Sequence, residues 1–362
     1  MRSGLREDTI SVGDRSIGEL GEFGLIAEMA ARMRSGPGTI VGIGDDAAVL
    51  AAPDGRVVAT TDFLLEGRHF RREWAGASDI GHRAAVRSLA DIAAMGAVPT
   101  ALLIAFAAPP SLPAAWALDL AAGLAAESAR AGASVAGGDT ARSETVLLAV
   151  TGLGDLQGRN PVTRSGARPG DVVAVAGPLG RSAAGLAMLR AGIAEPAELV
   201  AAHLRPAPPY DAGPEAAALG ATAMIDISDG LLADVGHIAD ASGVLVDIRT
   251  ASLDVGPLEA AGAAVGMCGE EKEREGGTGR GAPASPGASL DAGPAVHPGA
   301  GGAGSALDWV LTGGEDHSLA ATFPPGVALP PRWSVVGQVR EGRGVLVDGQ
   351  PYRGVPGWDH FR

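Results

Sequence analysis

The stretch TTDFLLEGRH, residues 60–69, closes a β-favouring run with an aspartate and places a histidine seven residues further on. The run begins at Val57, the aspartate is Asp62 and the histidine is His69. A second stretch, VGIGDDAAVL at residues 41–50, sets two adjacent aspartates behind glycines. Carboxylates at the ends of neighbouring apolar segments repel one another unless a cation lies between them. The pattern therefore raises the question of what neutralises these charges.

The composition is that of a globular protein without a polyanionic partner. The chain has 362 residues, of which 46% are hydrophobic, 19% charged and only 4% aromatic, so small aliphatic side chains must fill its core. This length suits about two domains. A net charge of −14 argues against nucleic acid as a partner. A small phosphorylated substrate remains compatible, because metal ions bridge acidic groups to phosphate.

The cysteine and lysine content excludes several chemistries. Cys268 is the one cysteine, so the chain forms no internal disulfide and no cysteine metal cluster. Lys272 is the one lysine, and both residues fall in an irregular segment. P-loop and protein-kinase sites need a lysine at the phosphates, so any nucleotide chemistry must neutralise phosphate in another way.

No targeting or membrane segment is expected. The N-terminal residues lack an apolar signal core. The apolar region 99–129 is interrupted by prolines and Asp119, which indicates a strand, a loop and a helix rather than a membrane span. We expect a cytoplasmic protein that does not bind membranes.

Predicted strands and helices alternate along the chain, which favours the mixed α/β (α+β) class. Apolar spacing predicts the helices and short apolar runs rich in β-branched residues predict the strands. In the first part we expect a helix at 22–34, two short strands within 46–62, a helix at 79–95, a strand at 101–107, a helix at 113–131, and two short strands flanking 137–139. In the second part we expect a strand at 171–176, helices at 182–190 and 229–241, and strands at 223–227, 244–248, 318–323, 334–339 and 345–347.

These patterns divide the chain into two domains with a leader and an insertion. Residues 1–20 are expected to be a flexible leader, 21–157 an N-terminal domain and 158–362 a C-terminal domain. Residues 269–305 are rich in glycine, alanine, proline and serine around the charged run EEKERE. Because this segment buries too little apolar area to offset its ordering entropy, we predict a disordered insertion.

Aspartates recur beside glycines or at the ends of predicted strands. The set is Asp45, Asp46, Asp62, Asp91, Asp139, Asp226 and Asp229. Two such carboxylates about 4 Å apart repel by ~4 kcal/mol at an effective dielectric of 20, so a convergent set needs counter-ions. Oxygen ligands suit Mg²⁺, Ca²⁺ or Mn²⁺ rather than zinc.

Single members of the set also have local explanations. Asp54 before glycine is typical of a turn. Asp91 fits an ion pair with Arg87 at helical spacing, and Asp229 fits the N-cap of the following helix. His69 alone is more typical of a surface or packed histidine. Only the collective pattern favours a metal site.

A dozen segments in chain order resemble the thiamine-monophosphate kinase family of the aminoimidazole-ribonucleotide-synthetase superfamily. They run from about residue 21 to the C-terminus outside the insertion: GEFGLIAEMA, GIGDDAAVL, TTDFLLEGRHF, SLADIAAMGAVP, GGDTARS, TRSGARPGDVVAVAG, SAAGLAML, HLRPAP, IDISDGLLADVGHIA, LTGGEDHSLAATF, VVGQV and GWDHF. Any one of them is a weak signal, and their shared order makes the resemblance specific.

The resemblance implies an enzyme of thiamine diphosphate biosynthesis that transfers the γ-phosphoryl group of ATP to thiamine monophosphate. It implies a two-domain aminoimidazole-ribonucleotide-synthetase-like fold. The N-terminal sheet domain would bind ATP and magnesium and pair in a homodimer, and the C-terminal α/β domain would close the cleft. Several Mg²⁺ ions would assist, and a monovalent cation such as K⁺ is a further candidate.

The resemblance also implies roles for individual residues. The magnesium ligands would be Asp46, Thr60, Thr61, Asp62, Asp91, Asp139, Asp226 and Asp229. The ATP contacts would be Gly138, Asp139, Arg164 and Ser228. The contacts to thiamine monophosphate would be His69, Glu315 and Trp358. Asp62, Asp139 and Asp229 would serve the catalytic step, and Asp45 and Arg142 are weaker candidates.

The reaction suits these residue types. The attacking phosphate is largely dianionic near neutral pH, so it needs charge neutralisation and in-line positioning rather than a strong base. Magnesium held by carboxylates supplies both. Three features depart from the family pattern. Residues 87–91 read RSLAD where relatives often have VNLSD, His317 stands where they often have tyrosine, and the insertion at 269–305 is added.

Other activities stay open as alternatives. Selenophosphate synthetase would need an N-terminal cysteine or selenocysteine with a lysine, and the hydrogenase-maturation relative a C-terminal cysteine, and this sequence has neither pattern. Aminoimidazole-ribonucleotide synthetase fits the fold but not the GGEDH and WDHF segments. A non-catalytic nucleotide- or cation-binding protein and a metal-dependent hydrolase are alternatives of other classes.

Overall fold

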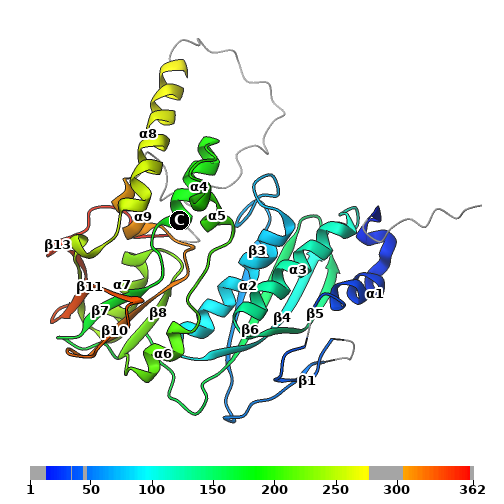
Figure 1. Ribbon diagram of the computed structural model, residues 1–362, viewed down its shortest axis with the longest axis horizontal. Coiled ribbons are helices and arrows are strands. Elements are labelled where there is room, and N and C mark those ends of the chain that lie inside the picture. The colour runs from blue at the N-terminus through cyan, green and yellow to red at the C-terminus, as the bar shows by residue number, and fades with distance from the viewer. Residues whose placement is uncertain (1–13, 34, 44–46, 277–304, 359–362) are drawn as a thin grey trace, which may run out of the picture. The chain divides into compact units, whose positions relative to one another are not determined.

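The computed structural model describes all residues except 1–13, 34, 44–46, 277–304 and 359–362, and the side chains of 268–276 (Figure 1). The chain divides into two compact units. One comprises Met1–Ala51, Thr61–Ala85 and Ala101–Thr151, and the other comprises Ala52–Thr60, Val86–Thr100 and Gly152–Arg362.

The first part of the chain contains a small helix–sheet arrangement. Its elements are α1 (Ile17–Ala30), β1 (Thr39–Val41), β2 (Val49–Leu50), β3 (Val58–Leu65), α2 (Ala77–Ala94), β4 (Val98–Ala108), α3 (Ala114–Arg130), β5 (Ser134–Arg142) and β6 (Leu147–Asp155). Four strands form one sheet in the order β3-β6-β4-β5, in which β4 and β5 run parallel. Strands β1 and β2 form a separate antiparallel pair.

Helices α2 and α3 pack at backbone distance because each has a glycine at the crossing. A Cβ added to Gly81 would lie 2.1 Å from the carbonyl oxygen of Leu120, and one added to Gly123 would lie 2.1 Å from that of Ser78. Any larger residue would push the two helices apart. Both helices lie over one face of the four-stranded sheet (Figure 1).

The N-terminal helix differs from the prediction in its start. It begins at Ile17 rather than near residue 22, because Ser16 and Glu19 form a capping box in which each side chain accepts from the other's backbone N–H. Residues 14–20 of the predicted leader are therefore ordered or helical, and residues 1–13 lie outside the described part. Gly21, with φ of 71°, introduces a kink just before the start of the predicted helix.

The GGDT segment also differs from the prediction. It forms the interior of one strand, β5, rather than a loop between two short strands. Gly138 pairs with Ile104 of β4, and a Cβ at this glycine would lie 1.9 Å from the Ile104 carbonyl oxygen. The absence of a side chain lets the two strands stay paired at this point.

The second part of the chain forms a larger α/β layer structure. Its elements are β7 (Val172–Ala176), α4 (Arg181–Ala191), α5 (Ala197–Leu204), α6 (Ala212–Ala218), β8 (Ala223–Ile227), α7 (Leu231–Ser242), β9 (Leu245–Ile248), the 3₁₀ turn η2 (Thr250–Ser252), α8 (Gly256–Gly276), α9 (Ala306–Thr312), β10 (Ser318–Phe323), β11 (Trp333–Arg340), β12 (Gly344–Val347) and β13 (Gln350–Pro351). The seven-stranded sheet has the order β13-β12-β9-β11-β7-β10-β8.

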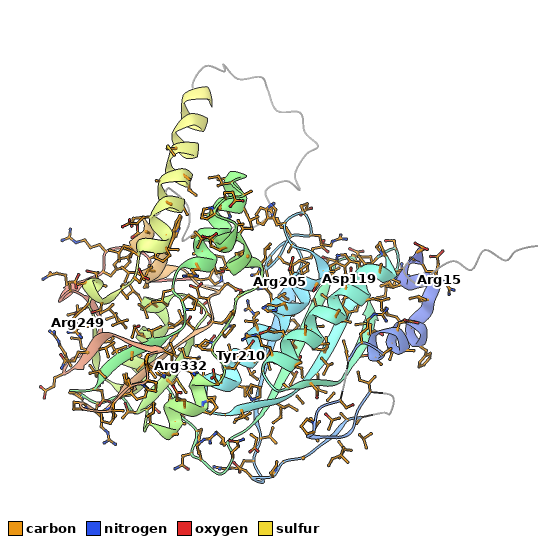
Figure 2. All side chains as sticks on the ribbon, viewed as in Figure 1. Arg15, Asp119, Arg205, Tyr210, Arg249 and Arg332 are labelled. Atoms are coloured by element: carbon orange, nitrogen blue, oxygen red, sulfur yellow. The ribbon has the colours of Figure 1, made fainter. Side chains whose placement is uncertain are left out.

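Strand β10 lies between β7 and β8 and is antiparallel to both. All residues of β8 and β10 are buried, which requires cover on both faces of the sheet. Helix α7 packs against β8, β9, β10 and β12. Exposed charged side chains such as Arg249 and Arg332 (labelled in Figure 2) belong to the outside of this layer structure. Because β10 is antiparallel to both β7 and β8, these two strands run in the same direction, and their carboxyl ends lie at the same end of the sheet.

The mixed helix–sheet class is confirmed, and strands β8 and β10 have the predicted bounds. The prediction of disorder from residue 269 is wrong for its first residues, because α8 continues to Gly276. The run EEKERE consists of strong helix formers, so it extends the helix without needing a core. Residues 277–304 lie outside the described part. No helix among the described residues is long and apolar enough to cross a membrane.

Candidate active site

The turn between α9 and β10 has the sequence GGEDH, residues 313–317, and lies against the end of β8. Glu315 N donates to the Ser228 carbonyl at 2.8 Å and His317 N donates to the Ile227 carbonyl at 2.9 Å. Gly314 permits this approach, since an added Cβ would lie 2.2 Å from the Ser228 carbonyl oxygen. Glu315 and His317 have φ of 66° and 53°, a region that side-chain-bearing residues rarely adopt.

The three polar side chains of this turn reach three different parts of the structure. Glu315 Oε1 accepts from Arg87 Nη1 of α2 at 2.6 Å. The Asp316 carboxylate accepts from the backbone N–H groups of Gly180, at 2.5 Å, and Ser182, at 2.8 Å, at the start of α4. His317 Nδ1 lies 3.2 Å from Asp226 Oδ2 at the end of β8. The GGEDH turn thus makes contacts to α2, to the N-terminus of α4 and to the C-terminal end of β8.

The surroundings raise the pKa of His317 and of Asp316. For His317, desolvation lowers the pKa, but hydrogen bonds and charges from Asp226 and Glu315 outweigh it and raise the pKa to about 9. For Asp316, burial raises the pKa to about 7, although the Ser182 and Gly180 N–H groups act against this. His317 therefore carries a positive charge at neutral pH between two carboxylates.

A second turn follows β8 and contains Asp229. The N-cap residue of α7 is Gly230 and makes no side-chain cap, so the N-cap explanation of Asp229 is wrong. Instead, the buried Asp234 carboxylate accepts from the N–H groups of Asp229 and Gly230, both at 3.0 Å. Burial and the charges of Asp226 and Asp229 raise the pKa of Asp234 well above its usual value. Three acidic side chains, Asp226, Asp229 and Asp234, thus lie near this end of β8, and their proximity favours the protonated form of Asp234.

The predicted substrate residue Trp358 meets this second turn. Its backbone N–H donates to the Asp229 carbonyl at 3.0 Å. Gly357 allows the contact, because a Cβ there would lie 2.5 Å from the same carbonyl oxygen. The predicted ATP residue Ser228 lies between the two turns, and Arg164 is exposed.

The remaining predicted ligands lie on β3, α2 and β5. Thr60 Oγ1 donates to Asp91 Oδ2 at 2.7 Å, so these two predicted magnesium ligands are in contact. Thr61 Oγ1 accepts from Thr151 Oγ1 at 3.2 Å. Asp62 is half-buried on β3.

On β5, the predicted ATP and metal residues face solvent. Asp139 is exposed, and its Oδ1 accepts from Thr140 N at 2.8 Å. Gly138 and Arg142 of the same strand are exposed as well.

His69 has a defined tautomer in its neutral form. Its Nδ1 accepts from Leu65 N at 3.1 Å, so the proton of a neutral imidazole resides on Nε2.

The predicted eight-ligand set is not assembled within the described residues. Asp45 and Asp46 lie outside them, and elsewhere no group of three histidine, cysteine or acidic side chains gathers closely enough to hold a metal ion. What the structure brings together is the Thr60–Asp91 pair and the two ion pairs that His317 makes with Asp226 and with Glu315, in which the imidazole lies between the carboxylates. All the predicted ligands offer oxygen atoms only, which fits magnesium.

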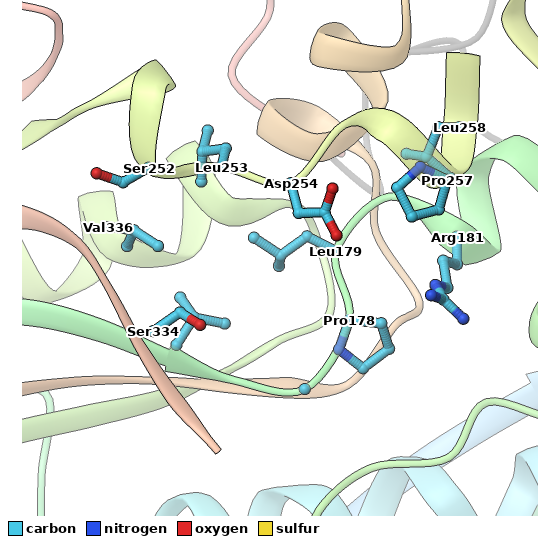
Figure 3. A pocket seen from close by; sticks show the side chains of 12 residues that line it. Pro178, Leu179, Arg181, Ser252, Leu253, Asp254, Pro257, Leu258, Ser334 and Val336 are labelled. Atoms are coloured by element: carbon cyan, nitrogen blue, oxygen red, sulfur yellow. The ribbon is translucent and has the colours of Figure 1, made fainter. Parts of the chain in front are cut away.

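A separate pocket of about 210 Å³ lies beside the start of α4 (Figure 3). Arg181, Ser252, Asp254 and Ser334 provide its polar groups, and leucine, valine and proline side chains the rest. No predicted site residue lines it in the described part of the chain. The pocket therefore does not belong to the site predicted from the sequence.

Sequence reasoning missed Arg87, Asp234 and Asp316 as members of this region. Arg87 was considered only as a partner of Asp91 on one helix face, whereas it bonds to a residue 228 positions later in the chain. No local signal in the sequence indicates such a pair. Asp316 could have been found, because it is the acidic residue beside Glu315 in the GGEDH segment.

Comparison with known proteins identifies the family of this chain. AIR synthase related protein, N-terminal domain, matches residues 44–156, and AIR synthase related protein, C-terminal domain, matches residues 168–273. The thiamine-monophosphate kinase of Mycobacterium tuberculosis is 42% identical over 98% of this chain and 96% of its own length. The chain belongs to the thiamine-monophosphate kinase family. Family membership places it among enzymes, the thiamine-phosphate kinases.

Solved structures of this family agree with the fold. The thiamine-monophosphate kinase of Stenotrophomonas maltophilia is 30% identical with a TM-score of 0.70, over 91% of this chain and 96% of that one. AaThiL complexed with AMPPCP and TMP is 31% identical with a TM-score of 0.69, over 95% of this chain and 98% of that one. The two-domain aminoimidazole-ribonucleotide-synthetase-like fold is thereby confirmed.

Proposed function

We propose that this protein transfers the γ-phosphoryl group of ATP to thiamine monophosphate by direct in-line displacement, giving thiamine diphosphate and ADP. The observation that carries the proposal is the 42% identity to a thiamine-monophosphate kinase over 98% of the chain. A further support is the likeness to AaThiL, which is complexed with AMPPCP and TMP. A bond forms between a phosphate oxygen of thiamine monophosphate and the γ-phosphorus, and the bond to the β-phosphate oxygen breaks.

Magnesium would be held by the oxygen ligands predicted from the sequence. These are Asp46, Thr60, Thr61, Asp62, Asp91, Asp139, Asp226 and Asp229. Magnesium bound there supplies charge neutralisation between the two phosphate groups. Asp62, Asp139 and Asp229 serve the catalytic step through this role. A monovalent cation such as K⁺ belongs to the proposal as a further ion.

Separate sets of residues would contact ATP and thiamine monophosphate. Gly138, Asp139, Arg164 and Ser228 would contact ATP. His69 would donate through Nε2, since its Nδ1 already accepts from Leu65 N. Glu315 would orient thiamine monophosphate while Arg87 holds its carboxylate. Trp358 would present a flat ring to the thiamine heterocycle.

The proposal includes a homodimer, a cytoplasmic location and a domain boundary near residue 157. Phe63 on β3 and Ile40 and Val41 on β1 have apolar side chains that are 58%, 69% and 36% exposed, and pairing of the N-terminal domains would have to bury such side chains. Such side chains are typical of interfaces when they gather on one part of a surface. Sedimentation would test the dimer.

Product analysis tests the proposed reaction. Purified protein is incubated with ATP, Mg²⁺ and thiamine monophosphate, and the thiamine compounds are separated by chromatography. We expect thiamine diphosphate from the monophosphate, none from thiamine, and none when EDTA removes the metal. Hydrolysis of ATP without thiamine diphosphate would contradict the proposal and favour a hydrolase.

A further inference from the structure

His317 lies between two carboxylates of the candidate site. Its side chain is 2% exposed, with Nδ1 3.2 Å from Asp226 Oδ2 and Nε2 3.8 Å from Glu315 Oε2. The two carboxylates come from places 89 residues apart in the chain, the end of β8 and the turn before β10. The imidazole therefore links two carboxylates that are far apart in the chain.

The backbone fixes where this imidazole points. Glu315 and His317 both have positive φ, and their N–H groups bond to Ser228 and Ile227. Asp316 anchors the same turn from the other side through the start of α4. The turn therefore has anchors other than the imidazole.

Each carboxylate keeps one oxygen away from His317. On Glu315, Oε1 accepts from Arg87 Nη1, so this side chain is held from two directions. On Asp226, Oδ2 is the oxygen that lies against His317 Nδ1. A buried carboxylate between fixed donors loses the rotational freedom that it would have in water.

We propose that His317 is a positioning residue that sets Asp226 through Nδ1 and Glu315 through Nε2. The inference rests on the proposed function, in which Asp226 binds magnesium and Glu315 binds thiamine monophosphate. The two contacts are separate, so each can be removed without the other. Loss of the first would weaken metal binding, and loss of the second would weaken binding of thiamine monophosphate.

Two substitutions separate these contacts. The amide nitrogen of asparagine in His317→Asn takes the place of Nδ1, and that of glutamine in His317→Gln takes the place of Nε2. We expect His317→Asn to bind thiamine monophosphate about tenfold more weakly and Mn²⁺ within about twofold of the parent. We expect His317→Gln to bind Mn²⁺ about tenfold more weakly and thiamine monophosphate within about twofold of the parent. Calorimetry without ATP measures the first constant, and the electron paramagnetic resonance signal of free Mn²⁺ measures the second.

His203→Gln is the matched control. His203 is another buried histidine, on α5, with Nδ1 3.1 Å from Ser182 Oγ. We expect this variant to change neither binding constant, even where it lowers the melting temperature as much as the His317 variants do. A merely structural role for His317 predicts the same behaviour for all three variants.

Three results would overturn the inference. They are equal changes of both constants in both His317 variants, no change in either, and no binding of Mn²⁺ by the parent protein. Product analysis of the parent tests the proposed function separately. If the parent forms thiamine diphosphate but neither variant weakens one binding constant selectively, the role of His317 is refuted and the proposed function is not. A parent that forms no product refutes the proposed reaction, while the Mn²⁺ titration still tests the contact to Asp226.

Discussion

Asp139 on β5 and Asp226 on β8 are both predicted magnesium ligands, yet the structure surrounds them differently. Asp139 is exposed, and its carboxylate accepts one backbone hydrogen bond within its own strand, from Thr140. Asp226 is 4% exposed and lies beside the buried His317. Water stabilises the first charge, whereas burying the second costs several kcal/mol unless a cation accompanies it. The comparison teaches that the buried Asp226 needs a counter-charge, which His317 supplies, whereas the exposed Asp139 is stabilised by water and needs no such partner to fold.

The largest expected effect is on turnover at the exposed ligand. Asp139→Asn keeps the shape and the Thr140 hydrogen bond but removes the charge. We expect turnover with ATP and thiamine monophosphate to fall by about 10²–10³-fold, with the free energy of unfolding within about 0.5 kcal/mol of the parent. Asp62→Asn should lower turnover by a similar factor. Near-parent turnover in the Asp139 variant would remove this residue from the metal site.

At the buried ligand we expect a loss of stability as well as of turnover. Asp226→Asn leaves the buried His317 cation with one carboxylate fewer, so the free energy of unfolding should fall by about 3 kcal/mol. Urea titration in the presence of EDTA measures this without metal. Asp240→Asn, on an exposed position of α7, is the control and should change stability by less than about 0.5 kcal/mol. Equal free energies of unfolding for Asp226→Asn and Asp240→Asn would contradict the expected difference between a buried and an exposed aspartate.

The smallest expected effect is a pH dependence from the buried Asp316. Burial raises the pKa of Asp316 to about 7 from the ordinary value of 3.8. Between these values the folded protein holds a proton that the unfolded chain has released, so the contribution to stability falls as pH rises. Asp316→Asn removes this contribution. The stability lost by the substitution should therefore be smaller at pH 8 than at pH 5, as urea midpoints at both pH values would show. A larger loss at pH 8 would contradict the assignment.

Periodicity alone placed most of the elements. Strands β8 and β10 were predicted with their observed bounds because each is a short, mostly apolar run that is too short for a helix and is bounded by polar residues or proline. The start of α1 was missed because its capping box precedes the apolar pattern, and the GGDT strand was missed because glycine pairs argue for turns. The helical extension to Gly276 was missed because charged residues carry no apolar period.

The sequence by itself determined the fold class, the family and the set of acidic residues, because these depend on composition, period and the order of motifs. Only the tertiary structure decided that Arg87 reaches Glu315, that Asp234 supports the Asp229 turn and that His317 lies between two carboxylates. These contacts join residues far apart in the chain, through turns whose direction is set by packing against β8. Local sequence does not encode such distances, because they arise only when distant segments share one buried volume.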